Sequence, residues 1–170
     1  YAFIKNPIVN SKGFNTSAIY GFMNSLLDLI KRENPKYIGV CFDKGGSTSR
    51  SDIFSDYKAN RLETPEAITL GIPYIKEILT AMDIPTVEME GYEADDIIGT
   101  LAKKAEKDDF TVFMVTPDKD FAQLVSKNIF IYKPARMGND VEIMGIKEVN
   151  EKFEIENPKQ VIDYLGMVGD

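Results

Sequence analysis

Two kinds of apolar pattern alternate along this chain. Between Thr16 and Asn34, apolar residues recur at the i, i+3, i+4, i+7 spacing of one buried helix face, and Asn34-Pro35 ends the predicted helix. These positions are Ile19, Phe22, Met23, Leu26, Leu27 and Ile30. The following run, 37–42, is short and nearly continuously apolar, which is typical of a strand buried on both faces. Residues 1–13 show neither pattern and are expected to be irregular.

The same succession of helix and strand continues after residue 63. Thr64-Pro65 predicts a helix start with Thr64 as N-cap, and Pro73 is expected to kink or split that helix. Its apolar stripe is Ile68, Ile72, Ile75, Ile78, Leu79 and Met82. A strand over 85–89 should follow, and then a helix whose apolar positions run from Ile97 to Ala105.

The last third of the chain predicts further elements of both kinds. The strongest strand pattern covers 110–115, and a short helix is expected over 121–125. The remaining elements are strands at 128–132 and 140–144 around a turn at 137–139, a helix at 146–153, and a final helix capped by Asn157-Pro158. Residues 1–170 are therefore expected to form a single α/β domain with a mainly parallel central sheet flanked by helices.

The segment 44–63 lacks a regular pattern and is rich in cations. It carries Lys44, Arg50, Lys58 and Arg61 together with Phe54 and Tyr57, and a partial helix is plausible over 52–61. Acidic residues are interleaved with the cations, so a solvated loop is an equally good interpretation. The aromatic residues could stack on bases, but anchoring the loop to the body of the domain is the better interpretation. The position directly after a predicted strand favours phosphate contacts, so we interpret 44–63 as a partly helical basic arch.

The amino-acid composition restricts the kinds of catalytic and metal site that the chain can form. The chain has no histidine, so imidazole is excluded as a general base or zinc ligand, and a metal site must use oxygen ligands, which suits Mg²⁺ or Mn²⁺. The net charge of −7 argues against a general nucleic-acid coat but allows a nuclease with local DNA contacts. No apolar run is long enough for a membrane span, and no signal-peptide pattern is present. The single Cys41 fits a reduced thiol, and we expect a cytoplasmic protein.

Carboxylates follow three of the predicted strands. Glu93, Asp95 and Asp96 crowd into four residues ahead of a helix, where the helix dipole alone would explain acids about as well as function would. Asp43 directly follows the strand at 37–42, and on its own it fits a turn residue better. Asp118 and Asp120 follow the strand at 110–115, and each could simply cap the next helix. The recurrence at three strand ends favours a shared function.

The ends of parallel strands provide the reason for such a recurrence. Ligand sites in open parallel sheets lie beyond the carboxyl ends of the strands, so the six carboxylates are expected to point into one crevice. Their mutual repulsion requires cations, and two divalent ions can support in-line phosphoryl displacement by a metal-bound hydroxide. The sequence therefore predicts a two-metal phosphodiesterase site.

Five segments carry a more specific signal: residues 42–43, 57–61, 91–102, 116–120 and 169–170, of which the string from Gly91 to Ala102 is the most specific. Together they resemble the 5′-nuclease domain of bacterial DNA polymerase I, a family related to the flap endonucleases with a PIN-like fold. The resemblance implies a Mg²⁺- or Mn²⁺-dependent 5′→3′ exonuclease and structure-specific flap endonuclease. Its implied substrates are DNA with 5′ flaps, nicks or RNA primers, processed during replication and repair.

The resemblance also implies roles for individual residues. The implied metal-site acids are Asp43, Glu93, Asp95, Asp96, Asp118, Asp120 and Asp170. Lys58 and Arg61 match the arch residues that grip the 5′ strand near the scissile phosphate, so we count them with the catalytic set, and Arg50 would be an accessory phosphate contact. The implied partner besides DNA is a downstream polymerase domain of the same polypeptide, in a monomer with no membrane association.

Three departures from the family pattern accompany the resemblance. The family begins with a further strand ending in a metal-binding aspartate and continues beyond Gly-Asp into a helix–turn–helix element, so we expect these 170 residues to be a fragment that is not fully active alone. Ser49 and Ser51 stand where the family usually has an aromatic residue and a histidine. Two alternatives stay open: a catalytically silent DNA-binding or structural remnant of the polymerase, and a single-metal phosphoryl-transfer α/β domain.

Overall fold

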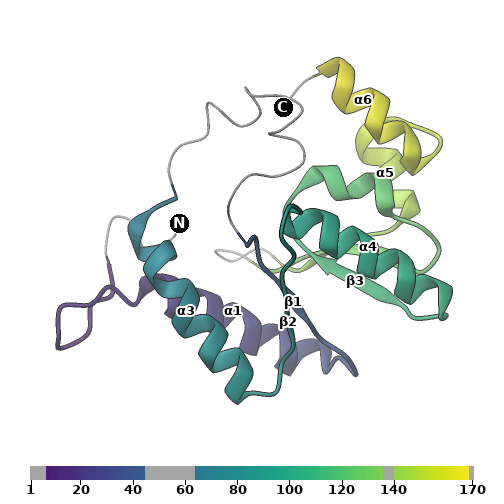
Figure 1. The fold of residues 1–170 in the computed structure, drawn as a ribbon. Coiled ribbons are helices and arrows are strands. Elements are labelled where there is room, and N and C mark those ends of the chain that lie inside the picture. The colour runs from purple at the N-terminus through teal and green to yellow at the C-terminus, as the bar shows by residue number, and fades with distance from the viewer. Residues whose placement is uncertain (1–6, 45–63, 136–139, 169–170) are drawn as a thin grey trace. The chain divides into compact units, whose positions relative to one another are not determined.

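The computed structural model describes residues 7–44, 64–135 and 140–168 of the chain (Figure 1). The chain divides into two compact units, residues 1–94 and 95–170. The predicted arch helix at 52–61 and the turn at 137–139 lie outside the described residues.

The first unit is built on two helices and a pair of parallel strands. Helices α1 (Ser17–Glu33) and α3 (Glu66–Ala81) pack against each other, and a Cβ atom on Gly71 would lie only 3.3 Å from that of Ala18. Strands β1 (Val40–Cys41) and β2 (Thr86–Val87) are parallel, with Val40 opposite Thr86. The core of this unit consists of Leu26, Ile75, Leu79 and Ile84.

The second unit places helices around a three-stranded sheet. Strand β3 (Val112–Val115) is parallel to β4 (Ile129–Lys133), which pairs antiparallel with β5 (Glu142–Met144). The other elements are α4 (Ala94–Lys107), whose first residue closes the first unit, η1 (Lys119–Leu124), α5 (Ile146–Phe153), η2 (Pro158–Gln160) and α6 (Val161–Val168). Met114, Ile129, Ile131 and Val149 are among the most buried core residues.

The α/β class and the parallel character of the strands are confirmed, because two of the three strand pairings within the described ranges are parallel. The pairings fall in two separate hydrogen-bonded sheets, however, where the sequence predicted one. The strand predicted over 37–42 is also shorter than expected and only half-buried. Tyr37, at its expected start, is 65% exposed with the ammonium of Lys36 over its ring. An apolar run becomes a strand only where a partner backbone pairs with it, and pairing here covers two residues.

Helix α3 corrects two predictions. It begins at Glu66 after an N-cap at Pro65, so Thr64 is not its N-cap. It also runs unbroken through Pro73, so of the two expected outcomes, a kink or a split, the split is wrong. A proline removes one backbone donor from the helix ladder. The buried Gly71, Ile75 and Leu79 on either side of Pro73 keep the helix packed in the core, which offsets that loss.

Candidate metal centre

Asp43 and the acidic segment meet at the ends of the two parallel strands of the first unit. Asp43 Oδ1 accepts a hydrogen bond of 2.6 Å from the backbone N–H of Ala94, the first residue of α4. A carboxylate at this position satisfies a donor that the helix start leaves unpaired and is favoured by the helix dipole. The bond engages one carboxylate oxygen of Asp43. Residues 51 positions apart in the sequence are thus brought together.

Glu93, directly ahead of α4, is a buried carboxylate. Only 8% of it is exposed, and among the described residues Ser17 and Glu93 are the buried polar or charged ones. Gly91, at φ +79°, turns the chain between β2 and this position in a conformation that residues with a Cβ rarely adopt. Burying a carboxylate costs free energy unless partners compensate, so the fold places Glu93 where a carboxylate is seldom found.

Asp95 and Asp96 occupy the first turn of α4, and Asp118 and Asp120 follow β3. Asp118 Oδ1 accepts a 2.9 Å hydrogen bond from the backbone N–H of Asp120, so Asp118 is the N-cap of η1. The capping role that the sequence offered as an alternative is therefore real for Asp118. It uses one oxygen, so capping and metal binding are compatible.

The second unit holds α4 and η1 together through specific contacts. A Cβ atom on Gly99 would lie 3.0 Å from Leu124 Cδ1, so glycine permits the close approach. Lys103 Nζ donates to the carbonyl of Leu124 at 3.1 Å and pairs with Glu106 at 3.2 Å. The Ser126 hydroxyl donates to the Glu106 carboxylate and lowers the pKa of that group. Helix α4, which carries Asp95 and Asp96, is therefore packed directly against η1, which carries Asp120 and is capped by Asp118.

The predicted acids divide between the two units. Asp43 and Glu93 belong to the first, and Asp95, Asp96, Asp118 and Asp120 belong to the second. Among the residues that the structure describes, no three acidic or cysteine side chains form a group that could hold a metal ion. The donor chemistry fits a hard divalent cation, because every candidate ligand is a carboxylate. Convergence of the full set stays a prediction, and Asp170, Arg50, Lys58 and Arg61 lie outside the described residues.

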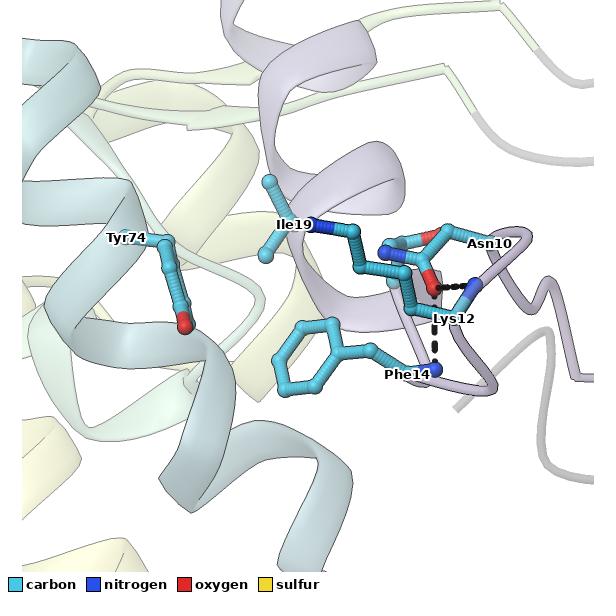
Figure 2. Close-up of a pocket in the computed structure, with 6 residues that line it drawn as sticks. Asn10, Lys12, Phe14, Ile19 and Tyr74 are labelled. Carbon is cyan, nitrogen blue, oxygen red and sulfur yellow. Dashed lines mark hydrogen bonds between the residues drawn. The ribbon is translucent and has the colours of Figure 1, made fainter.

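Sequence reasoning missed a pocket of about 350 Å³ in the first unit (Figure 2). Its lining residues are Asn10, Lys12, Phe14, Thr16, Ile19 and Tyr74. Asn10 Oδ1 accepts hydrogen bonds from the backbone N–H groups of Lys12 and Phe14, which shapes the loop. The Phe14 ring lies edge-on to Tyr74 of α3 at 5.3 Å. The only signals in the sequence were turn residues, because Asn10 to Thr16 has no periodic pattern.

Comparison with solved structures defines the class of fold. The chain superimposes with a TM-score of 0.70 on the T5 D15 protein co-crystallized with metal ions, over 89% of this chain and 59% of that one, at 22% identity. The catalytic core of Rad2 in complex with DNA substrate gives a TM-score of 0.56 over all of this chain and 51% of that one, at 18% identity. These likenesses confirm the predicted PIN-like 5′-nuclease fold.

Sequence comparison then defines the family. Residues 1–154 match the family model of the 5′-3′ exonuclease N-terminal resolvase-like domain, and the chain belongs to that family. It is 46% identical over 164 residues to a 5′-3′ exonuclease of Aquifex aeolicus, covering 96% of this chain and 55% of that protein. It is 41% identical over 170 residues to DNA polymerase I of Bacillus subtilis, covering 99% of this chain and 19% of the polymerase. The chain thus spans about half the length of the first relative and a fifth of the second.

None of the helices within the described ranges is long and apolar enough to cross a membrane.

Proposed function

We propose that this chain is the nuclease domain of a divalent-metal-dependent 5′→3′ exonuclease and flap endonuclease, which hydrolyses phosphodiester bonds at 5′ ends and flaps of DNA. The observation that carries the proposal is the hydrogen bond from Ala94 to Asp43, which joins the acidic segment to a second strand end. Family membership supports it, as does the fold shared with the T5 D15 protein, which was crystallized with metal ions.

The proposed metal ligands are Asp43, Glu93, Asp95, Asp96, Asp118, Asp120 and Asp170, and the proposed ions are two Mg²⁺ or Mn²⁺. Bound divalent ions supply a low-pKa water and stabilise charge on the phosphate oxygens. The backbone N–H of Ala94 holds Asp43 by one oxygen and thereby orients the other. The N–H of Asp120 does the same for Asp118. Because these carboxylates are already oriented, their side chains need to move less when the substrate binds.

The proposed DNA contacts come from the arch segment. Lys58 and Arg61 would grip the 5′ strand near the scissile phosphate, and Arg50 would add a phosphate contact. Lys58→Ala should raise the KM for a 5′-flap substrate while leaving the half-saturating Mn²⁺ concentration unchanged, because a phosphate contact is lost and no metal ligand is. Steady-state cleavage at varied DNA and varied Mn²⁺ concentrations measures both. A shift in the metal dependence with an unchanged KM would contradict the assignment.

Cleavage of a labelled 5′-flap duplex by the Asp118→Asn variant of the full-length protein tests the proposed activity. Asparagine is as good an N-cap as aspartate, so η1 should keep its stability, but it removes a negative ligand. We expect cleavage with Mg²⁺ or Mn²⁺ to fall by at least about a hundredfold. Asp163→Asn in α6, outside the proposed set, is the matched control.

Wild-type activity with no loss in Asp118→Asn would refute the metal assignment. Absence of cleavage by the full-length wild type with either metal would favour a catalytically silent DNA-binding domain.

A further inference from the structure

Lys76, near the middle of α3, contacts residues at the ends of both strands of the first unit. Its Nζ lies 5.1 Å from the centroid of the Phe42 ring and forms an ion pair with Glu88. Phe42 immediately follows β1, and Glu88 immediately follows β2. The side chains of Lys76 and Glu88 are 31% and 38% exposed, so solvent screens these contacts only in part. One ammonium group thus joins three elements.

These Lys76 contacts lie at the ends of β1 and β2, next to the candidate ligand Asp43. The hydrogen bonds between the strands end with the bond from Phe42 N–H to the Val87 carbonyl, at 2.9 Å. Beyond that bond the chain continues into Asp43 on one side and Glu88 on the other. The Lys76 ammonium therefore contacts the chain next to the last hydrogen bond between β1 and β2, beside the candidate ligand Asp43. A second ion pair close to these strand ends, Lys44 with Glu90 at 3.7 Å, is far more exposed and contributes less.

The chemistry of lysine suits this double contact. An ammonium group presents three rotatable donors on a long apolar stem, so it can donate to a carboxylate while lying over an aromatic face. The hydrogen bond from Lys76 lowers the pKa of Glu88, as pairing with a cation does for a carboxylate. Both attractions hold the two strand ends at a fixed separation.

We propose that Lys76 is a positioning residue for the candidate metal centre. By fixing Phe42 and Glu88, it holds Asp43 where its carboxylate accepts the Ala94 N–H and presents its second oxygen beside the start of α4. The inference deepens the proposed function and rests on it for its catalytic consequence. The inference also has a structural part, namely that Lys76 stabilises the Asp43–Ala94 hydrogen bond. This part can be tested without measuring nuclease activity.

Amide hydrogen exchange of Ala94, followed by NMR, measures that structural part. In Lys76→Met, which keeps the stem and removes the charge, we expect the Ala94 amide to exchange about three- to tenfold faster than in the wild type. Amides of α1 should be unchanged. Lys76→Arg should restore protection, because a guanidinium can contact both the carboxylate and the ring. The matched control is Lys147→Met, which removes another lysine–glutamate pair, with Glu151 in α5.

Unchanged Ala94 exchange in Lys76→Met would overturn the proposal, and so would an equal acceleration in Lys147→Met or across α1. If Lys76→Met fails to fold, Glu88→Gln provides the same readout, because it removes the ion pair and leaves the cation over Phe42.

The catalytic consequence appears in the metal dependence of flap cleavage. Lys76→Met should raise the half-saturating Mn²⁺ concentration about three- to tenfold at an unchanged KM for DNA, and Lys76→Arg should restore it. A raised KM with an unchanged metal dependence would overturn the positioning role. A full-length wild type that cleaves nothing with Mn²⁺ would refute the proposed function, and the exchange experiment would still decide whether Lys76 supports Asp43.

Discussion

At the scale of single residues, two of the candidate aspartates also serve the fold. Asp118 caps η1, and Asp43 accepts a hydrogen bond from the first residue of α4. As alternatives to metal binding, the sequence offered a turn role for Asp43 and a capping role for Asp118. These roles and metal binding are compatible, because each hydrogen bond takes one oxygen of a group that has two. The partner of Asp43 could not be predicted from local spacing, since it lies 51 residues away.

Two substitutions at Asp43 should separate these roles. Asp43→Asn keeps an oxygen that can accept from Ala94, so stability should be nearly unchanged while metal-dependent cleavage falls by at least about tenfold. Asp43→Ala should lose cleavage and also about 0.5–2 kcal/mol of stability, as for other lost N-caps. Urea unfolding and flap cleavage measure the two effects. Full activity in Asp43→Asn would rule out a ligand role for Asp43.

At the scale of elements, helices followed the sequence more closely than strands did. The predicted helix at 146–153 has the bounds of α5, and α1 ends at Glu33 as the Asn34-Pro35 signal predicted. Asn34 takes the left-handed conformation of a C-cap. Hydrogen bonds within a helix join residues close in sequence, so apolar periodicity and capping residues are enough to predict most helix bounds. Strand bounds depend on a distant partner, and the predicted 85–89 strand pairs only over Thr86–Val87.

The packing of α4 on η1 predicts that a larger side chain at position 99 destabilises the protein. Gly99→Val should destabilise the protein by about 1–3 kcal/mol, because the Cβ position already lies 3.0 Å from Leu124 Cδ1. Gly166→Val in α6 is the matched control, since nothing lies within 4 Å of its Cβ position. Leu124→Ala in the Gly99→Val background should recover part of the loss in urea unfolding. Equal effects at Gly99 and Gly166 would show that helix propensity alone decides the outcome.

At the scale of the whole molecule, the sequence predicted the fold class and family, and both are confirmed. Alternating helices and strands indicated the α/β class, and the string from Gly91 to Ala102 indicated the family. The division of the strands into two sheets was not predictable, because pairing between distant segments leaves no local pattern. Asp43 and Asp118 come from different units, so whether they share a metal centre stays a prediction.

Calorimetric titration with Mn²⁺ tests most directly whether the carboxylates at the strand ends form a metal centre. The wild type should bind two ions per chain, and Asp43→Asn and Asp118→Asn, one substitution in each unit, should each weaken or abolish binding of at least one of them. No saturable Mn²⁺ binding by the wild type, or binding that neither substitution changes, would contradict the account.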